Sequence, residues 1–219
     1  MPNGATVAAR RLRVSLATTA IVVSAISAGC GGAGSPSTRE FVRYHDPNGV
    51  FIADLPATHV LAATEPRAEG QTAPGILAGV IAEPPGEPSP SSGLGGGIAL
   101  AADPDRTSFQ VLVITSGGFE SLEDMVLSYL TADPSIDVRE ERPTRVGGDP
   151  GLLLVADVLR DGAPTAGIAA VFSLGHGGTG VILASVFPPG TWDAERADFL
   201  RLLRSFRTDL APGELALPF

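Results

Sequence analysis

The sequence predicts an α+β fold in which an antiparallel β-sheet is flanked by helices. Its apolar residues fall mostly in short runs rich in β-branched side chains, and turn sequences separate these runs, as expected of strands joined by hairpins. Two other stretches have helical spacing and lie apart from each other along the chain. Because strands follow one another without a helix between each pair, antiparallel pairing is favoured over a parallel βαβ winding.

The first predicted element is a β-hairpin that opens the domain. Residues 41–44 and 50–54 are its strands, and they flank the turn sequence Asp-Pro-Asn-Gly at 46–49, where Gly49 can adopt a positive φ. Pro56 is expected to end the second strand because proline donates no ladder hydrogen bond.

Further strands are predicted over the apolar residues 76–82, 95–101 and 107–115. The proline-rich segment 83–90 lies between the first two of these strands. We expect this segment to project as a loop, because proline cannot continue a hydrogen-bonded ladder.

A short helix is expected after the strand 107–115. Ser121 can cap its first turn, and Asp124 lies three residues later, at the capping-box position. The residues that recur at helical spacing are Leu122, Met125, Val126 and Tyr129, and Pro134 closes the segment.

Residues 151–187 contain three apolar runs, which are separated by Asp161-Gly162 and by the glycine-rich segment 175–178. This pattern predicts an antiparallel meander. Small residues at alternate positions indicate that one face of the meander is packed and the other is shallow. They include Gly167, Ala169 and Ser173.

A last helix is predicted from Thr191, which can act as its N-cap, to about Phe206. Its apolar stripe has the i, i+3, i+4, i+7 spacing of a helix that lies on a sheet. The stripe consists of Phe199, Leu202, Leu203 and Phe206. Trp192, at the start of the helix, is expected to pack onto the sheet.

The first 29 residues are predicted to be an export signal that is removed. Arg10, Arg11 and Arg13 form a positive start, and residues 14–26 form an uncharged apolar stretch that is too short to span a bilayer comfortably. The single cysteine, Cys30, follows this segment, and residues 31–37 are typical of a flexible tether. The arginine pair leaves both the general and the twin-arginine export routes open.

The residues Ser27-Ala28-Gly29-Cys30 resemble the lipobox of bacterial lipoproteins. The resemblance implies that the mature chain begins at Cys30, whose sulfur carries diacylglycerol and whose amino group is acylated, with palmitate as an expected acyl group. The protein would then be lipid-anchored on the extracytoplasmic face of the cell membrane. The alternative is an ordinary secretory signal followed by an incidental cysteine.

On the lipoprotein interpretation, the chain divides into four parts. Residues 1–29 are the lipoprotein signal peptide and residues 30–39 are the tether. Residues 40–210 form a single α+β domain, and residues 211–219 form a tail.

Charge and cysteine content exclude several classes of function. The chain carries a formal charge of −9, which becomes −12 when residues 1–29 are removed, because they hold three arginines and no acid. Such an acidic protein is repelled by phosphate backbones, so neither a nucleic acid partner nor a general electrostatic hold on anionic lipid is expected. A single cysteine allows neither an internal disulfide nor a thiolate metal cluster.

No cofactor or metal site is predicted. Gly175, Gly177 and Gly180 match the spacing of a dinucleotide fingerprint, but an apolar strand follows where a helix N-terminus is needed, so a turn between strands explains them better. The acidic residues considered as cation ligands are typical of a turn (Asp103, Asp105) and of a helix N-terminus (Glu120, Glu123, Asp124). The histidines lie too far apart in sequence for a zinc motif, at His45, His59 and His176.

Residues 41–56 combine an aromatic before a tight turn with a proline that closes the hairpin, and Val186-Phe187 is followed by a final helix that ends in Ser205-Phe206. These two parts of the chain resemble the Mog1/PsbP-like superfamily and, among exported actinobacterial proteins, the LpqN/LpqT type of mycobacterial lipoprotein. The resemblance covers about residues 40–209. It implies an antiparallel sheet flanked by helices but no activity, because this fold hosts several unrelated binding roles. Arginine without any lysine, with abundant Ala, Gly and Pro, is typical of a GC-rich, actinobacterial source.

The predicted anchor, the scaffold and the missing catalytic motif favour a non-catalytic cell-envelope protein. We expect a binding or assembly module whose partner is an envelope lipid or glycolipid, or a membrane protein. The alternative is an envelope hydrolase with a site assembled from dispersed loop residues. The residues that such a site would use are Ser108, Ser116 or Ser185 with His45 or His176.

A binding site is expected beside the long loop at residues 83–97. The flanking strands are apolar on both alternating sets of side chains, which indicates a hydrophobic face or groove next to the loop. The residues predicted to contact a ligand or partner are Pro84, Pro85, Leu94 and Ile98, and the expected occupant is an acyl chain or an apolar partner surface. The alternative is that a helix covers this second face and the loop has no role.

Overall fold

Strands outnumber helices in the part of the chain that the structure describes. The structure is a computed structural model and describes residues 39–66, 75–86, 106–115, 119–131, 135–175 and 179–208. Its strands are β1 (Phe41–His45), β2 (Phe51–Pro56), β3 (Val60–Thr64), β4 (Ile76–Glu83), β5 (Ser108–Thr115), β6 (Ile136–Val146), β7 (Asp149–Arg160), β8 (Ala163–Leu174), β9 (Thr179–Phe187) and β10 (Arg207–Thr208). Its helices are α1 (Leu122–Val126), the π-helical segment η1 (Leu127–Thr131) and α2 (Trp192–Ser205).

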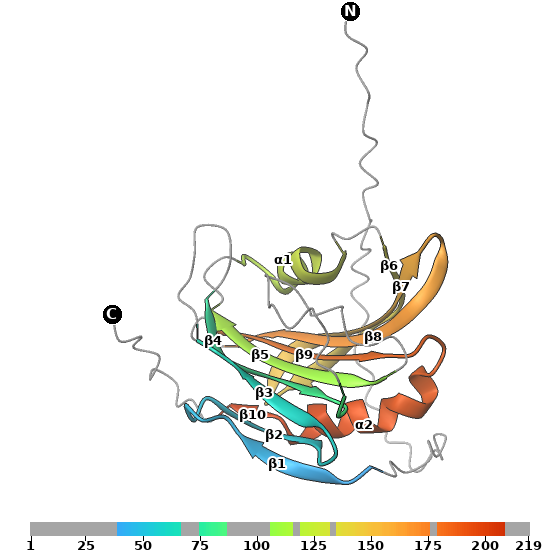
Figure 1. Cartoon of the computed structure of the whole chain (residues 1–219). Coiled ribbons are helices and arrows are strands. Elements are labelled where there is room, and N and C mark those ends of the chain that lie inside the picture. The colour runs from blue at the N-terminus through green and yellow to red at the C-terminus, as the bar shows by residue number, and fades with distance from the viewer. Residues whose placement is uncertain are drawn as a thin grey trace, which may run out of the picture. The chain divides into compact units, whose positions relative to one another are not determined.

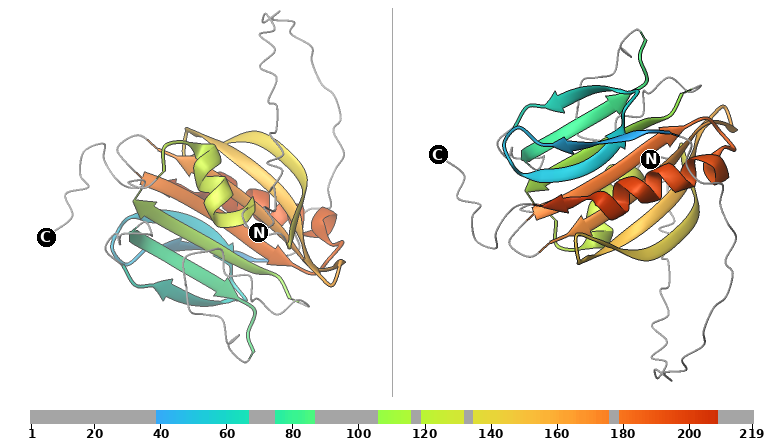
Figure 2. Two further views of the ribbon diagram at one scale, coloured as in Figure 1. Left: turned by 90° about the horizontal axis from the view of Figure 1, so that it is seen from above. Right: turned by 90° about the horizontal axis from the view of Figure 1, so that it is seen from below.

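All strand pairs in these residues are antiparallel, and they form two sheets. Seven strands make a large sheet in the order β3-β4-β5-β9-β8-β7-β6, and a small sheet has the order β1-β2-β10. Figure 1 shows α1 on one face of the large sheet, whereas α2 and the small sheet lie on the other. The views from above and below agree with this layering (Figure 2). The predicted α+β class, an antiparallel sheet flanked by helices, is confirmed.

The opening hairpin forms as the sequence predicts, and Asp46 holds its turn. Oδ2 of Asp46 accepts hydrogen bonds from the backbone N–H groups of Asn48 (2.9 Å) and Val50 (3.1 Å). Gly49 has a φ of +71°, which a residue without Cβ adopts at little cost. After α2, the short strand β10 adds to the other edge of β2, an addition that the sequence did not predict.

The first hydrophobic core lies between the large sheet and the layer of α2 and the small sheet. Phe51, Phe199 and Phe206 are fully buried in it, and Leu203 is 8% exposed. Trp192 stacks on Phe187 with ring centroids 5.6 Å apart and meets Phe199 edge-on. The predicted apolar stripe of the last helix and the packing role of Trp192 are therefore confirmed.

A second core lies on the opposite face of the large sheet, under α1 and η1. Phe172 and Ile182 of the sheet are buried there with Met125 and Leu130 of the two helical segments. The prediction that one face of residues 151–187 is shallow is wrong. Small side chains such as Ala169 and Ala170 lie on opposite faces and both are fully buried, because a helix covers each face.

The two predicted N-caps have different outcomes. Ser121 caps α1 as expected, since its Oγ accepts a hydrogen bond from the backbone N–H of Asp124 at 3.1 Å. Thr191 precedes α2 as expected, but it does not cap the helix. Its hydroxyl instead donates to the carbonyl oxygen of Pro188 at 2.8 Å, which closes the preceding turn.

The turns of the predicted meander lie where the sequence places them. Asp161 and Gly162 both have positive φ, 53° and 78°, as the tight turn between β7 and β8 requires. Strand β9 begins at Thr179 and runs through Gly180, so the glycine-rich segment before it joins two strands and precedes no helix.

Strands β3 and β6 were not predicted. Both are edge strands of the large sheet, with a neighbouring strand on one side only. Edge strands are more exposed to solvent, so their sequences show a weaker apolar pattern. Strand β6 carries charged residues along most of its length and includes Pro143, which an edge tolerates. The predicted strand 95–101 lies outside the described residues. No helix in the described part of the chain is both long and apolar enough to cross a membrane.

Candidate functional site

An open groove of about 580 Å³ lies between the β6–β7 turn and the C-terminal half of α2. The two elements that form it are far apart in sequence. They meet because α2 packs on the same face of the sheet as Val146 and Leu153. The groove is lined by Thr144, Arg145, Gly147 and Gly148 on one side and by Leu200, Leu203, Arg204 and Arg207 on the other.

The hairpin side of the groove is kept free of bulk by two glycines. Gly147 and Gly148 have positive φ, 60° and 108°, and a Cβ added at either position would meet no atom within 4 Å. Arg145 ties the turn together, because its Nη1 donates to the carbonyl oxygen of Gly148 at 2.8 Å. The remaining N–H groups of this guanidinium are available to a ligand.

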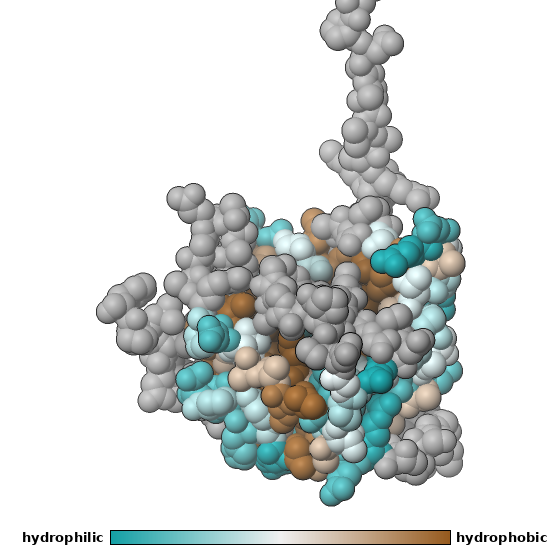
Figure 3. Space-filling model, in the orientation of Figure 1, coloured by the Kyte–Doolittle hydropathy of each residue, from teal (hydrophilic) through white to brown (hydrophobic). Residues whose placement is uncertain are grey.

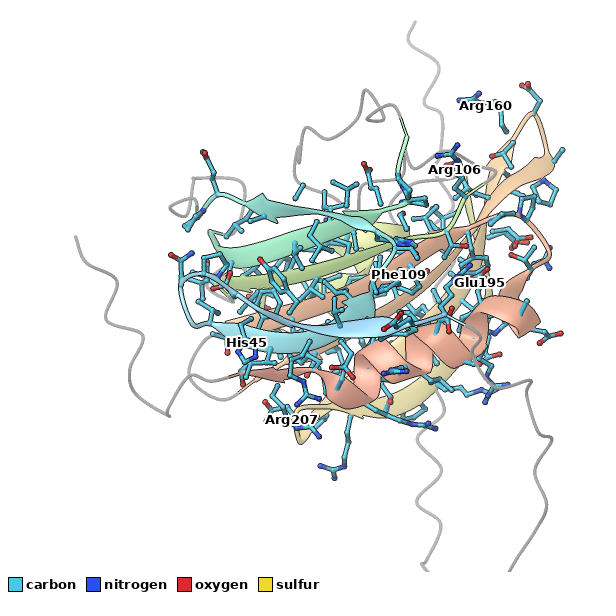
Figure 4. All side chains as sticks on the ribbon, turned by 60° about the horizontal axis from the view of Figure 1, so that its bottom comes forward. His45, Arg106, Phe109, Arg160, Glu195 and Arg207 are labelled. Carbon is cyan, nitrogen blue, oxygen red and sulfur yellow. The ribbon has the colours of Figure 1, made fainter. Side chains whose placement is uncertain are left out.

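The helix side combines an apolar floor with exposed cations. Leu203 is buried and Leu200 is half-buried, whereas Arg204 and Arg207 are exposed. Nη1 of Arg207 donates to the carbonyl oxygens of Arg204 (2.8 Å) and Phe206 (2.6 Å), which fixes its position at the end of the helix. Figure 4 shows Arg207 at the end of α2 opposite to Glu195.

The chemistry of the groove is suited to binding. The described residues that line it supply three guanidinium groups, one hydroxyl and two leucine side chains, with no carboxylate, imidazole or thiol. Guanidinium groups remain charged at all physiological pH values and hydrogen-bond to anionic oxygens. The groove therefore presents donors for an anion beside an apolar surface.

A second polar cluster lies at the N-terminal half of α2. Nη1 and Nη2 of Arg39 contact the two carboxylate oxygens of Glu195 at 2.5 and 3.0 Å, and Nη1 also contacts Oδ2 of Asp198 at 2.8 Å. Both carboxylates are largely buried. The hydrogen bond to Glu195 and the negative charges of Glu195 and Asp198 raise the pKa of Arg39. Arg39 is the last residue of the predicted tether, so these contacts fix the point where the chain enters the domain.

His59 lies half-buried near this cluster, and its ring packs against Phe109 with centroids 5.8 Å apart. Its Nε2 is 2.9 Å from the carbonyl oxygen of Thr107, and its Nδ1 is 3.3 Å from the hydroxyl of Thr58. A carbonyl only accepts, so the neutral tautomer with the proton on Nε2 satisfies both contacts. Burial lowers the pKa of His59 below its usual value. The hydrogen bond to Thr107 opposes this effect, and the positive charge of Arg39 adds to it.

We expect stability to decrease as the pH falls from about 6.5 toward 5, in part because of His59. Its pKa is lower in the folded state, so the unfolded chain binds the proton more readily in this range. The contribution of His59 to stability is fully present above the pKa that this residue has in the unfolded chain, and it is lost as the pH falls toward the pKa of the folded state. His59→Gln should flatten the dependence of the urea midpoint on pH between 5 and 6.5. An equal slope in both proteins would show that His59 does not titrate as described.

The residues predicted to bind a ligand are only partly described. Pro84 is half-buried and Pro85 is exposed, and they follow the end of β4. Nη1 of Arg106 donates to the carbonyl oxygen of Pro85 at 2.9 Å. Leu94, Ile98 and the predicted lipidation site Cys30 lie outside the described residues. The assignment of this loop as a binding site stays a prediction.

Strand β4 is buried on both faces, and the predicted hydrophobic face or groove beside the loop stays a prediction, since the other flanking residues lie outside the described ranges. The side chains of Ile76, Leu77, Val80 and Ile81 on both faces are at most 8% exposed. The exposed apolar residue of this region is instead Val60 of β3, which pairs with Glu83 and is 60% exposed. In Figure 3 apolar surface runs down the middle of the face that carries these strands.

The residues considered for a hydrolase do not meet in the described structure. Phe109 is the register partner of Ser185, so the side chains of Ser108 and Ser185 point to opposite faces of the sheet. Both serines are buried, and His45 is exposed at the end of β1 in the small sheet. Ser116 and His176 lie outside the described residues.

Sequence reasoning missed the groove between the β6–β7 turn and α2. The signal on the helix side is a row of arginines three residues apart, at Arg201, Arg204 and Arg207. The signal on the hairpin side is the Gly147-Gly148 pair close to Arg145. Neither signal shows that the two segments meet.

No protein-family model matches the sequence, and neither does any curated protein. Among solved structures, the chain is similar to PsbP (CyanoP) from the cyanobacterium Synechocystis sp. PCC 6803, with 12% identity, a TM-score of 0.49, and coverage of 82% of this chain and 98% of that chain. It is also similar to LpqN of Mycobacterium tuberculosis, a protein involved in cell envelope biogenesis, with 11% identity, a TM-score of 0.44, and coverage of 78% and 92%. PA94 of Pseudomonas aeruginosa aligns with 11% identity, a TM-score of 0.38, and coverage of 82% and 99%.

At 11–12% identity the likeness concerns the fold alone.

Proposed function

We propose that this chain is a non-catalytic binding or assembly module of the cell envelope, lipid-anchored through Cys30 on the extracytoplasmic face of the cell membrane. Its partner is an envelope lipid or glycolipid, or a membrane protein. The groove between the β6–β7 turn and α2 is the binding site. The observation that carries the proposal is this groove, which combines three arginines with a leucine floor in a chain of formal charge −9.

The composition of the groove supports binding of an amphiphilic partner. Leu200 and Leu203 offer apolar contact, and the arginines offer charged donors at the rim. Its volume of about 580 Å³ is in the range usual for sites that bind small molecules. Membrane lipids and the membrane-proximal parts of proteins both combine apolar and charged groups in this way.

The position of Arg39 supports a role near the membrane. Its contacts with Glu195 and Asp198 hold the end of the predicted tether on α2. From Asp198 to Arg204 the axial distance along the helix is about 9 Å. A tether of residues 30–39 spans at most about 35 Å when fully extended. A domain held in this way keeps the groove within reach of the bilayer surface.

A photo-crosslinking residue placed at Leu200 in living cells tests this proposal. Leu200 is half-buried and lines the groove. Leu127 is 54% exposed on η1, which packs on the second core across the large sheet, and provides the matched control position. We expect covalent adducts with an envelope lipid or a membrane protein from position 200, and not from position 127. Equal adducts at both positions, or a crosslinked chain found in the cytoplasm, would contradict the proposal.

A further inference from the structure

The arginines of the groove differ in their partners from five other arginines of the domain. In the described part of the chain, Arg145, Arg204 and Arg207 form no ion pair with a carboxylate. By contrast, ion pairs with Asp or Glu are formed by Arg39, Arg43, Arg139, Arg142 and Arg201. Three cations without a carboxylate partner thus converge on one groove of an acidic chain.

Helix stabilisation explains only part of this arrangement. Cations near a helix C-terminus interact favourably with its dipole, and Arg207 binds two carbonyl oxygens there. Arg145, however, belongs to the β6–β7 hairpin and makes its hydrogen bond within that turn. Arg204 donates no hydrogen bond to any described residue. Arg204 lies in the last turn of α2, so the helix dipole favours its charge as well. The position of Arg145 across the groove from these two residues is not required by the helix.

We infer that the groove binds the phosphate of an anionic membrane lipid headgroup. Arg145 and Arg204 donate to the phosphate oxygens from opposite walls, and the N–H groups of Arg207 that do not cap α2 add to them. Guanidinium forks match phosphate oxygens in geometry as well as in charge. This inference rests on the proposed function and specifies the ligand of the same groove.

Two features favour a lipid over a free anion. The leucine floor gives apolar contact to the glycerol and the first acyl carbons, which a free phosphate does not have. The Arg39 contacts hold the predicted tether on the same helix as the groove, so the most abundant anions nearby are those of the membrane surface. The overall charge of −9 opposes general binding to anionic lipid, so recognition depends on this local site.

Native mass spectrometry of the full chain in non-ionic detergent tests the inference. The chain is offered phosphatidylglycerol, diacylglycerol with the same acyl chains, or inorganic phosphate, each at low salt. We expect adducts with phosphatidylglycerol, none with diacylglycerol, and weaker adducts with phosphate. Because each arginine contributes charge-assisted hydrogen bonds, Arg204→Gln and Arg145→Gln should each weaken phosphatidylglycerol binding about tenfold.

Arg160→Gln is the matched control. It removes the same charge from an exposed residue at the β7–β8 turn, away from Arg207 (Figure 4), and should leave binding unchanged. Melting temperatures show whether each variant is folded. The two groove variants lie on different elements, so if one of them does not fold, the other still tests the inference. Adducts with diacylglycerol equal to those with phosphatidylglycerol, adducts with phosphate alone, or wild-type binding by both folded groove variants would each overturn the inference. Lipid binding by the groove in this assay does not depend on lipidation of Cys30. A negative result would therefore contradict the inference about the groove without contradicting the proposed anchor.

Discussion

Phe199→Ala is expected to lower the free energy of unfolding by about 3–5 kcal/mol. The Phe199 ring is fully buried between α2 and the large sheet and contacts Trp192, so its removal leaves a cavity that the two layers cannot close. Domains of this size are usually stable by about 5–15 kcal/mol, so the change removes a large part of the total. The midpoint of urea denaturation, at an unchanged slope, measures it.

Leu127→Ala is the control for Phe199→Ala. Leu127 is 54% exposed on η1, and a surface substitution of this kind changes stability by less than about 0.5 kcal/mol. Similar midpoints for Phe199→Ala and wild type would mean that α2 does not pack on the sheet through this stripe. Leu203→Ala is likewise expected to lower the free energy of unfolding by about 2–5 kcal/mol, because Leu203 is buried.

Cys30→Ala is expected to abolish lipid attachment and the hold of the protein on the membrane. Cys30 is the single cysteine of the chain and follows the residues that resemble a lipobox, so no other thiol can take its place. Stable anchoring needs more than one acyl chain, which the predicted diacylglyceryl and N-acyl groups would supply. Metabolic labelling with palmitate, followed by fractionation of the cells, measures both effects.

Ser35→Ala is the control for Cys30→Ala. Ser35 lies in the predicted tether, five residues after the cysteine, and its hydroxyl has no part in lipidation. This variant should label and fractionate as wild type does. Palmitate labelling that persists in Cys30→Ala would show that the acyl groups are attached elsewhere.

Elements that depend on local rules could be predicted from the sequence. The hairpin around Asp46 and Gly49 forms because the turn residues bind their own backbone, and α2 forms because its apolar stripe has helical spacing. The α+β class follows from the order of such elements. The edge strands β3 and β6 escaped prediction because one is short and the other is charged along most of its length.

The groove could not be predicted, because it depends on two segments that meet only in the folded chain. Arg145 and Arg204 are separated in sequence by three strands and most of a helix. Their common location follows from the packing of α2 beside Val146 and Leu153, which no local pattern encodes. The predicted shallow face of residues 151–187 failed for a related reason, since small residues in a sheet indicate close packing by a neighbouring layer as readily as exposure.

In the function proposed here, this domain works at a membrane to which Cys30 attaches it. Mass spectrometry of the N-terminal peptide, from the protein isolated out of its native cells, tests this attachment most directly. We predict a mature chain that begins at Cys30 and carries the added mass of a diacylglyceryl group and an N-linked acyl chain. A chain that retains residues 1–29, begins at another residue, or carries an unmodified Cys30 would contradict it.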